Sequence, residues 1–171
     1  IDCPGSDDFI GGVISSLQVT DMAILLINAQ YGVEVGTQNH FKYTEKFKKP
    51  AMFLLNKLDQ ETANYDLTIE QLRENFGKKI VQIQYPLVVG PGFNALIDVL
   101  MMKMYQWKPE GGVPEILPIP ESEMSKAAEL HNALVEAAAE NEESLMEKYF
   151  EEGTLNEDDM RLGIRKGLIK R

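Results

Sequence analysis

Two apolar runs, each followed by polar residues, form the clearest pattern in the chain. One run, Ala51–Leu55, lies between Pro50 and Asn56, and the other lies within Asp21–Asn28. Runs of this length without polar alternation are typical of parallel strands that are buried on both faces. Open α/β sheets bind ligands at the carboxyl ends of their strands, which is where the polar residues lie. The pattern predicts an α/β fold, with a partial parallel sheet and flanking helices.

Helical spacing of apolar residues surrounds these two strands. Asp66 is expected to cap the third helix and Gly77 to end it, with Leu67 and Leu72 facing inward. The three expected helices cover about Asp7–Leu17, Thr37–Phe47 and Asp66–Phe76.

The second half of the chain is organised differently. Lys79–Tyr85 alternates between polar and apolar residues, which predicts a strand before Pro86. The turn residues in Val88–Gly92 mark a domain boundary. Phe93–Trp107 has no clean period, and the pattern alone slightly favours a helix. Two further helices are expected, one over Ser122–Glu140 with Ser122 as its cap and one over Glu142–Glu152 with Phe150 buried. Asn156 is expected to cap a last helix, which has the basic residues Lys170 and Arg171 at its end.

The residues after the second strand, Asn56-Lys57-Leu58-Asp59, are suited to recognising guanine. The Asp59 carboxylate can accept two parallel hydrogen bonds, and guanine, unlike adenine, has two donors on one edge. A buried polar group left unpaired is costly, so such a site rejects the wrong base. Asn56 can donate to the carbonyl side of guanine, and the Lys57 stem can lie over the base. An ordinary surface turn would contain the same residue types, so the motif alone is not decisive.

A second candidate motif opens the chain as Asp2-Cys3-Pro4-Gly5. Asp2 offers a carboxylate to Mg²⁺, usually through water, and the Gly5 N–H can approach a terminal phosphate. Taken alone, this stretch is explained at least as well by a Pro-Gly turn. The order of motifs, strands and helices suits a nucleotide-binding α/β domain, so the two motifs together favour that interpretation.

These motifs resemble those of the GTP-binding domain of the translational GTPases, and elongation factor G most of all. The resemblance implies a GTP-binding domain over residues 1–87 and, over residues 88–171, the inserted subdomain of that family, with two short strands in 93–107. It implies GTP and Mg²⁺ as cofactors, with Asn56, Lys57 and Asp59 on guanine and Asp2 and Gly5 near the terminal phosphate and the metal. It extends through Asp2–Gly5, Ala23–Ala29, Gly32–Thr37, Asn56–Gln60, Leu100–Trp107, His131–Glu140 and Glu143–Tyr149.

The chain departs from the family pattern at Ser6. The family has a histidine there, which positions the attacking water, whereas serine is shorter and does not titrate near neutrality. His40 and His131 are the only histidines, and neither lies in the motif. The family's phosphate loop and first switch are absent, and its serine-alanine motif is expected beyond Arg171. We therefore expect a fragment that by itself binds GTP weakly or not at all and is inactive. In the parent we expect GTP hydrolysis to be slowed or lost.

Composition narrows the function further. The chain has 171 residues, 44% of them apolar, and its single cysteine, Cys3, excludes an internal disulfide and favours a cytoplasmic protein. It contains no apolar run long enough to span a membrane.

Residues 121–159 hold 13 of the 27 acidic side chains and two of the 17 basic ones, which gives this stretch a net charge of −11. This stretch would repel RNA phosphates and suits a basic protein partner better, although a solvated helix face explains it as well.

The resemblance implies that the parent is a ribosome-dependent elongation factor that drives tRNA and mRNA translocation. Its partners would be the ribosome, including stalk proteins through the acidic insert, and ribosomal RNA through other regions of the parent. Two alternatives stay open: a ribosomal-protection factor of the tetracycline-resistance type, and a non-enzymatic stalk-binding module.

Overall fold

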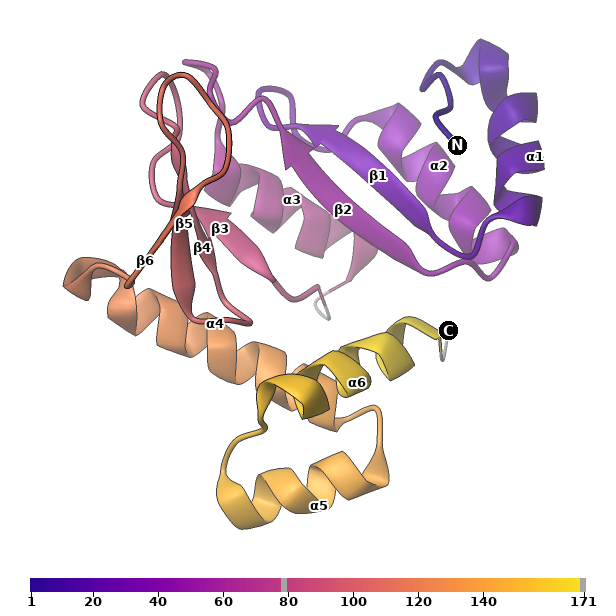
Figure 1. Ribbon diagram of the computed structural model, residues 1–171. Helices are drawn as coiled ribbons and strands as arrows, with labels where there is room; N and C mark the ends of the chain where they lie inside the picture. Colours follow the sequence, from indigo (N-terminus) through magenta and orange to yellow (C-terminus); the bar gives the residue numbers. More distant parts are fainter. Residues whose placement is uncertain (78–79, 170–171) are drawn as a thin grey trace. The chain divides into compact units, whose positions relative to one another are not determined.

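The computed structural model describes residues 1–77 and 80–169. The chain separates into two compact units, unit 1 and unit 2, and the division falls between residues 78 and 79. Residues 78, 79, 170 and 171 lie outside the described part. Two predictions therefore also lie outside it: the start of the expected strand at Lys79, and the basic residues Lys170 and Arg171 at the end of the last helix. Each unit has a sheet of its own (Figure 1).

Unit 1 is built on two parallel strands, as the apolar runs predict. They pair in register from Ala23↔Ala51 to Asn28↔Asn56, so both end at the same edge of the sheet. The elements are η1 (Asp7–Phe9), α1 (Ile10–Val19), β1 (Ala23–Asn28), α2 (Val35–Lys46), β2 (Ala51–Asn56) and α3 (Tyr65–Phe76). The expected helices and strands are therefore confirmed, with ends that differ by a few residues.

The core of unit 1 lies on one face of this sheet. The Phe41 ring of α2 and the Phe76 ring of α3 are 4.5 Å apart and both stack on Phe53 of β2, at 5.7 and 5.0 Å. The opposite face is not covered: the side chains of Ile24 and Leu26 are 55% and 62% exposed. The expectation that the apolar runs are buried on both faces is therefore wrong for this chain, because its helices pack on one side of a two-stranded sheet.

The start of α3 also differs from the prediction. Asn64, not Asp66, is the N-cap, and its side-chain oxygen accepts a hydrogen bond from the Leu67 N–H at 3.0 Å. This puts Leu67 in the first turn, where its side chain is exposed, whereas Leu72 is buried as predicted. Gly77 ends the helix with a φ of 106°, a value that favours glycine.

Unit 2 combines a small antiparallel sheet with three helices. The strand order is β3-β4-β5-β6, and the two strands implied for 93–107 are confirmed, so the helix that the pattern slightly favoured there is wrong. Of the strand predicted over Lys79–Tyr85, the described residues that form a strand are those at its end, in β3, which pairs with β4. The elements are β3 (Gln84–Pro86), β4 (Ala95–Asp98), β5 (Lys103–Gln106), β6 (Glu115–Leu117), α4 (Glu121–Ala139), α5 (Glu143–Glu152) and α6 (Glu157–Ile169).

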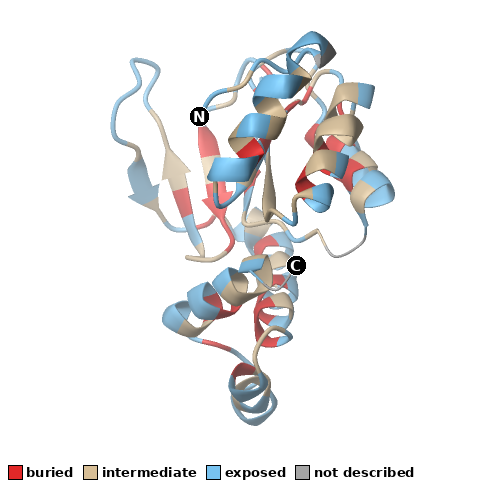
Figure 2. Ribbon diagram, turned by 90° about the vertical axis from the view of Figure 1, so that its right-hand side faces the viewer, coloured by how far each residue is buried: buried red, intermediate tan, exposed pale blue. Residues whose placement is uncertain are grey.

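The helices of unit 2 pack through small and aliphatic residues, which appear as the buried stripe along α4 and α6 in Figure 2. Ala138 of α4 is fully buried, and Gly163 of α6 lies so close that an added Cβ would be 2.7 Å from the Ala138 carbonyl carbon. Asn156 caps α6 as predicted, accepting from the Asp159 N–H at 2.9 Å. Two other predictions fail: Pro120, not Ser122, is at the N-cap of α4, and Phe150 is 77% exposed.

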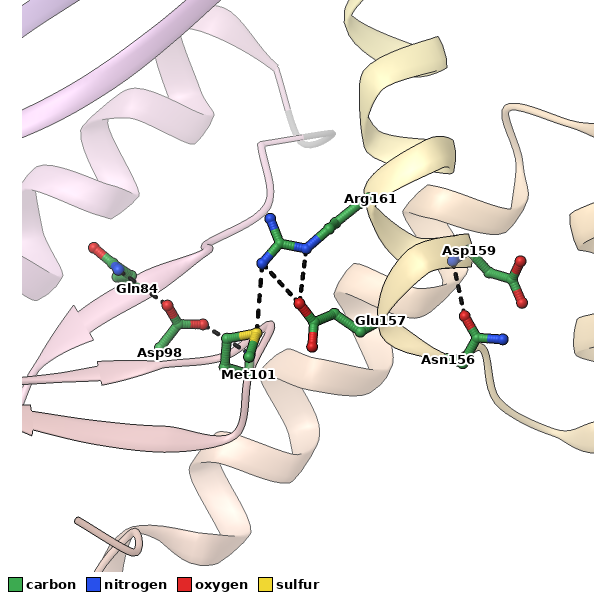
Figure 3. A network of polar contacts seen from close by, with 7 residues as sticks. All are labelled: Gln84, Asp98, Met101, Asn156, Glu157, Asp159 and Arg161. Carbon is green, nitrogen blue, oxygen red and sulfur yellow. Dashed lines mark hydrogen bonds and ion pairs between the residues drawn. The ribbon is translucent and has the colours of Figure 1, made fainter. Parts of the chain in front are cut away.

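Polar contacts hold the turn after β4 against α6 (Figure 3). The Asp98 carboxylate accepts from the Gln84 side-chain amide at 3.1 Å and from the Met101 N–H at 2.8 Å. Arg161 pairs with Glu157 at 2.8 Å and also contacts the Met101 sulfur at 3.6 Å.

Within the described residues, every helix is too short or too polar to cross a lipid bilayer.

Candidate functional site

The candidate site lies at the edge of unit 1 where β1 and β2 end together. The Ala29 N–H donates to the Asn56 carbonyl at 3.0 Å, which ties the first residue after β1 to the last residue of β2. The Asn64 N–H donates to the Ala29 carbonyl at 2.9 Å, so the loop after β2 returns to the same place. Both loops are therefore held at the carboxyl edge of the sheet, the usual ligand-binding edge of an α/β fold.

The loop after β2 presents its polar side chains outward. Leu58 is 8% exposed and anchors the loop, whereas Asn56, Lys57 and Asp59 on either side of it are exposed. Lys57 has a φ of 62°, an unusual backbone conformation for a non-glycine residue that lets the chain turn sharply here. A hydrogen bond from the Gln60 N–H to the Lys57 carbonyl at 3.2 Å closes the turn.

The hydrogen bonds of Asn56 and Asp59 define what each could offer a ligand. The Asn56 side-chain oxygen accepts from the Lys57 N–H at 2.8 Å, and its NH₂ group, which has no acceptor among the described residues, can donate to a ligand. One oxygen of the Asp59 carboxylate accepts from the Gln60 side-chain amide at 3.0 Å, so Gln60 already places an N–H donor on this group. The site therefore combines an amide donor with a carboxylate acceptor, the pair that the edge of guanine requires.

The N-terminal motif is a separate group of exposed residues in unit 1. Asp2, Gly5 and Ser6 are all exposed. An added Cβ on Gly36, at the start of α2, would lie 3.9 Å from the Gly5 carbonyl, so this segment runs beside that helix end. The Cys3 thiol donates to the Ser16 hydroxyl at 3.1 Å and holds the segment against α1. No hydrogen bond or ion pair between described residues joins it to the loop after β2.

Several residues that support the site were not predicted from the sequence. The Gln30 side-chain amide donates to the Thr62 hydroxyl at 2.7 Å and bridges the loops that follow β1 and β2. The Asn28 side-chain oxygen accepts from the Gln30 N–H at 3.0 Å. The Gln71 side chain of α3 accepts from the Val33 N–H at 2.9 Å. Polar residues directly after both strands are the signal from which this bracing could have been inferred.

Neither histidine is bonded to the residue at the family's histidine position, Ser6. The His131 Nδ1 of α4 is 2.7 Å from the Val99 carbonyl oxygen. The Nε2 of His40, on α2, is buried and has no hydrogen-bond partner among the described residues.

The donor set fits a guanine nucleotide and a hydrated Mg²⁺ in chemical type. Asn56 and Asp59 offer the complement of the guanine edge on an exposed loop, where a base can reach them. The described residues contain no cluster of three or more His, Cys, Asp and Glu side chains suited to a metal. A single exposed carboxylate such as that of Asp2 is compatible in type with Mg²⁺, since this ion retains several waters and binds phosphate oxygens.

The chain is similar to known proteins in both sequence and structure. A family model described as the elongation factor Tu GTP binding domain matches residues 1–156. The structure is similar to a crystal structure of the protein ttk003000868 from Thermus thermophilus, with a TM-score of 0.85 and 30% sequence identity over 98% of this chain. The match covers 25% of that protein, so the chain spans about a quarter of its length.

Proposed function

Because the chain belongs to the family of the elongation factor Tu GTP binding domain, we propose that it is part of a translation factor of the elongation factor G type. Members of this family bind guanine nucleotides, usually with Mg²⁺, and generally act on the ribosome. The specific proposal is a cytoplasmic, ribosome-dependent factor that promotes tRNA and mRNA translocation. Residues 1–87 would belong to its GTP-binding domain and residues 88–171 to its inserted subdomain.

The guanine-binding role of Asp59 carries this proposal. In it, the Asp59 carboxylate accepts from the ring N–H and amine of guanine, Asn56 donates to the carbonyl side, and the Lys57 stem covers the base. Asp2 and Gly5 contact the metal-bound water and the terminal phosphate. The observation that supports it most is the exposed Asn56-Lys57-x-Asp59 loop at the end of a parallel strand. Guanine binding there would displace Gln60 from the carboxylate.

Exchanging the carboxylate for an amide tests this assignment. In the intact protein, Asp59→Asn removes two charge-assisted hydrogen bonds, so GTP should bind about 10²–10⁴-fold more weakly, at about 1.5–3 kcal/mol per bond. Xanthosine triphosphate should bind better than GTP, because its additional carbonyl accepts from the new amide. Glu61→Gln, a charge change on the same loop outside the motif, serves as the control. Unchanged base preference in Asp59→Asn would contradict the assignment.

Ser6 is the basis of a second part of the proposal, that the parent hydrolyses GTP slowly. A missing water-positioning group costs about 10²–10⁴-fold in rate. Ser6→His in the intact protein should therefore raise ribosome-stimulated GTP hydrolysis by a factor in this range, while the affinity for GTP stays the same. Equal turnover by the unmodified protein and the Ser6→His variant would exclude slowed hydrolysis.

The partner proposed for the acidic helices is a basic protein of the ribosomal stalk. Most of the acidic side chains on α4, α5 and α6 are exposed, and Phe150 on α5 adds an exposed apolar ring among them. Titration of the chain with stalk protein should show binding that weakens as salt is raised. Absence of binding at high protein concentration would contradict this partner.

A further inference from the structure

A cleft between α1 and α2 is lined mainly by hydrogen-bond donors and is separate from the candidate guanine site. Its volume is about 440 Å³, and it lies between Ile10 of α1 and one face of α2. These two helices are neighbours in unit 1 (Figure 1). The α2 residues that line it are Asn39, Lys42, Tyr43 and Lys46.

The spacing of the α2 residues aims them at the same side of the helix. Lys42 and Tyr43 each lie three or four positions from Asn39 and from Lys46, the separation of neighbours on a helix face. The lining residues with described side chains offer two ammonium groups, an amide and a phenol, and none of them is a carboxylate. These residues together contribute a charge of about +2, even though the whole chain carries −10.

The donors in this cleft have no hydrogen-bond or ion-pair partner among the described residues. Neither Lys42 nor Lys46 forms an ion pair with another described residue. The side chains of Asn39 and Tyr43 likewise make no hydrogen bond inside the described part of the protein, although both are half-buried. This contrasts with unit 2, where Lys148 pairs with Asp159 and Lys166 with Glu142.

We propose that this cleft binds a phosphate group. A phosphate monoester carries about −1.5 to −2 charges and three strong acceptor oxygens, which match two ammonium groups and two neutral donors. A carboxylate has one charge and two oxygens and would leave part of this set unused. The side chain of Ile10 and the ring of Tyr43 provide apolar surface for the group that carries the phosphate. The phosphate monoester belongs either to a free small molecule or to the 5′ end of an RNA.

The test uses the whole 171-residue chain and two probes, inorganic pyrophosphate and a short single-stranded RNA with a 5′-phosphate. Calorimetry at low salt should detect binding, and Lys42→Gln and Lys46→Gln should each weaken it about fivefold to tenfold. Lys48→Gln is the matched control, since Lys48 is exposed just beyond α2 but does not line the cleft. Lys42→Arg should restore most of the affinity. Circular dichroism of each variant confirms that it is folded.

Amide chemical shifts then locate the bound probe. Shifts that change at Ile10 and along residues 39–46 support the proposal, and an Asp59→Ala variant should show the same changes, which separates this cleft from guanine binding. Pyrophosphate binding identifies a small-molecule source, and binding of the RNA alone identifies its terminal phosphate. The proposal is overturned if neither probe binds, or if Lys48→Gln weakens binding as much as the cleft variants.

Discussion

The close approach of α4 and α6 gives a prediction for the stability of unit 2. Gly163→Ala places a methyl group 2.7 Å from the Ala138 carbonyl carbon and 2.9 Å from its Cα, and closer still to the carbonyl oxygen. Carbon atoms in contact need about 3.5 Å, so the helices must separate by roughly 1 Å. A backbone carbonyl cannot rotate away as a flexible side chain would, so the change overpacks the interface.

The expected magnitude is the difference between two opposing effects. Overpacking a core costs about 1–3 kcal/mol. The cost of Gly163→Ala should be near the upper end of this range, because the neighbouring atoms belong to the rigid backbone of α4. Replacing glycine by alanine inside a helix contributes about 1 kcal/mol in the opposite direction. The net loss is about 1–2 kcal/mol, which lowers the melting temperature of a unit of this size by roughly 5–15 °C.

Tryptophan fluorescence provides the assay, because the single tryptophan, Trp107, lies in unit 2 and is half-buried. Gly12→Ala in α1 is the control: nothing lies within 4 Å of the added carbon, so this variant gains helix propensity without a clash. In Gly12→Ala, the unfolding temperature reported by Trp107 fluorescence should not change, while unit 1 becomes slightly more stable. A Gly163→Ala transition at or above the wild-type temperature would refute the packing described for α4 and α6.

Two further changes test other contacts. Asn64→Ala should destabilise unit 1 by about 1 kcal/mol, because it removes the only side-chain cap that α3 has in the described chain. Urea unfolding measures this loss, and an unchanged unfolding midpoint would contradict the role of Asn64 as the cap. Tyr85→Phe should reduce the loss of unit 2 stability at alkaline pH, because burial, and then the neighbouring Glu123, raise the pKa of Tyr85 above its ordinary value of 10.0. The folded state thus favours the neutral phenol, and its contribution is complete below about pH 10 and is lost as the pH rises. Unfolding followed at about pH 8 and about pH 11 checks this, and equal alkaline losses in both proteins would contradict it.

The strands of unit 1 were predictable because their apolar runs and polar ends are local features. Asn28 and Asn56 end the two runs, and they also end the two strands at matching register. The exposure of Ile24 and Leu26 was not predictable, because which face of a sheet is covered depends on distant helices. The prediction for Phe150 fails for a similar reason, since Leu145 is buried in α5 whereas Phe150 is 77% exposed.

Helix starts and site contacts show where local reasoning ends. Asn64 and Asp66 are both good caps, and the choice between them depends on how the chain returns to Ala29. The positions of Asn56 and Asp59 at a strand end followed from the sequence. The hydrogen bond of Gln60 to Asp59 and the bridge from Gln30 to Thr62 did not, because they depend on side-chain conformations within folded loops.

The most direct test of guanine recognition by Asp59 compares the affinities of GTP, inosine triphosphate and ATP for the unmodified intact protein. Inosine lacks the exocyclic amine, so it loses one hydrogen bond to the carboxylate and should bind about tenfold to a hundredfold more weakly than GTP. ATP offers neither donor to Asp59 and should bind at least about a hundredfold more weakly than GTP. Equal affinities for GTP and inosine triphosphate, or for GTP and ATP, would contradict the role assigned to this carboxylate.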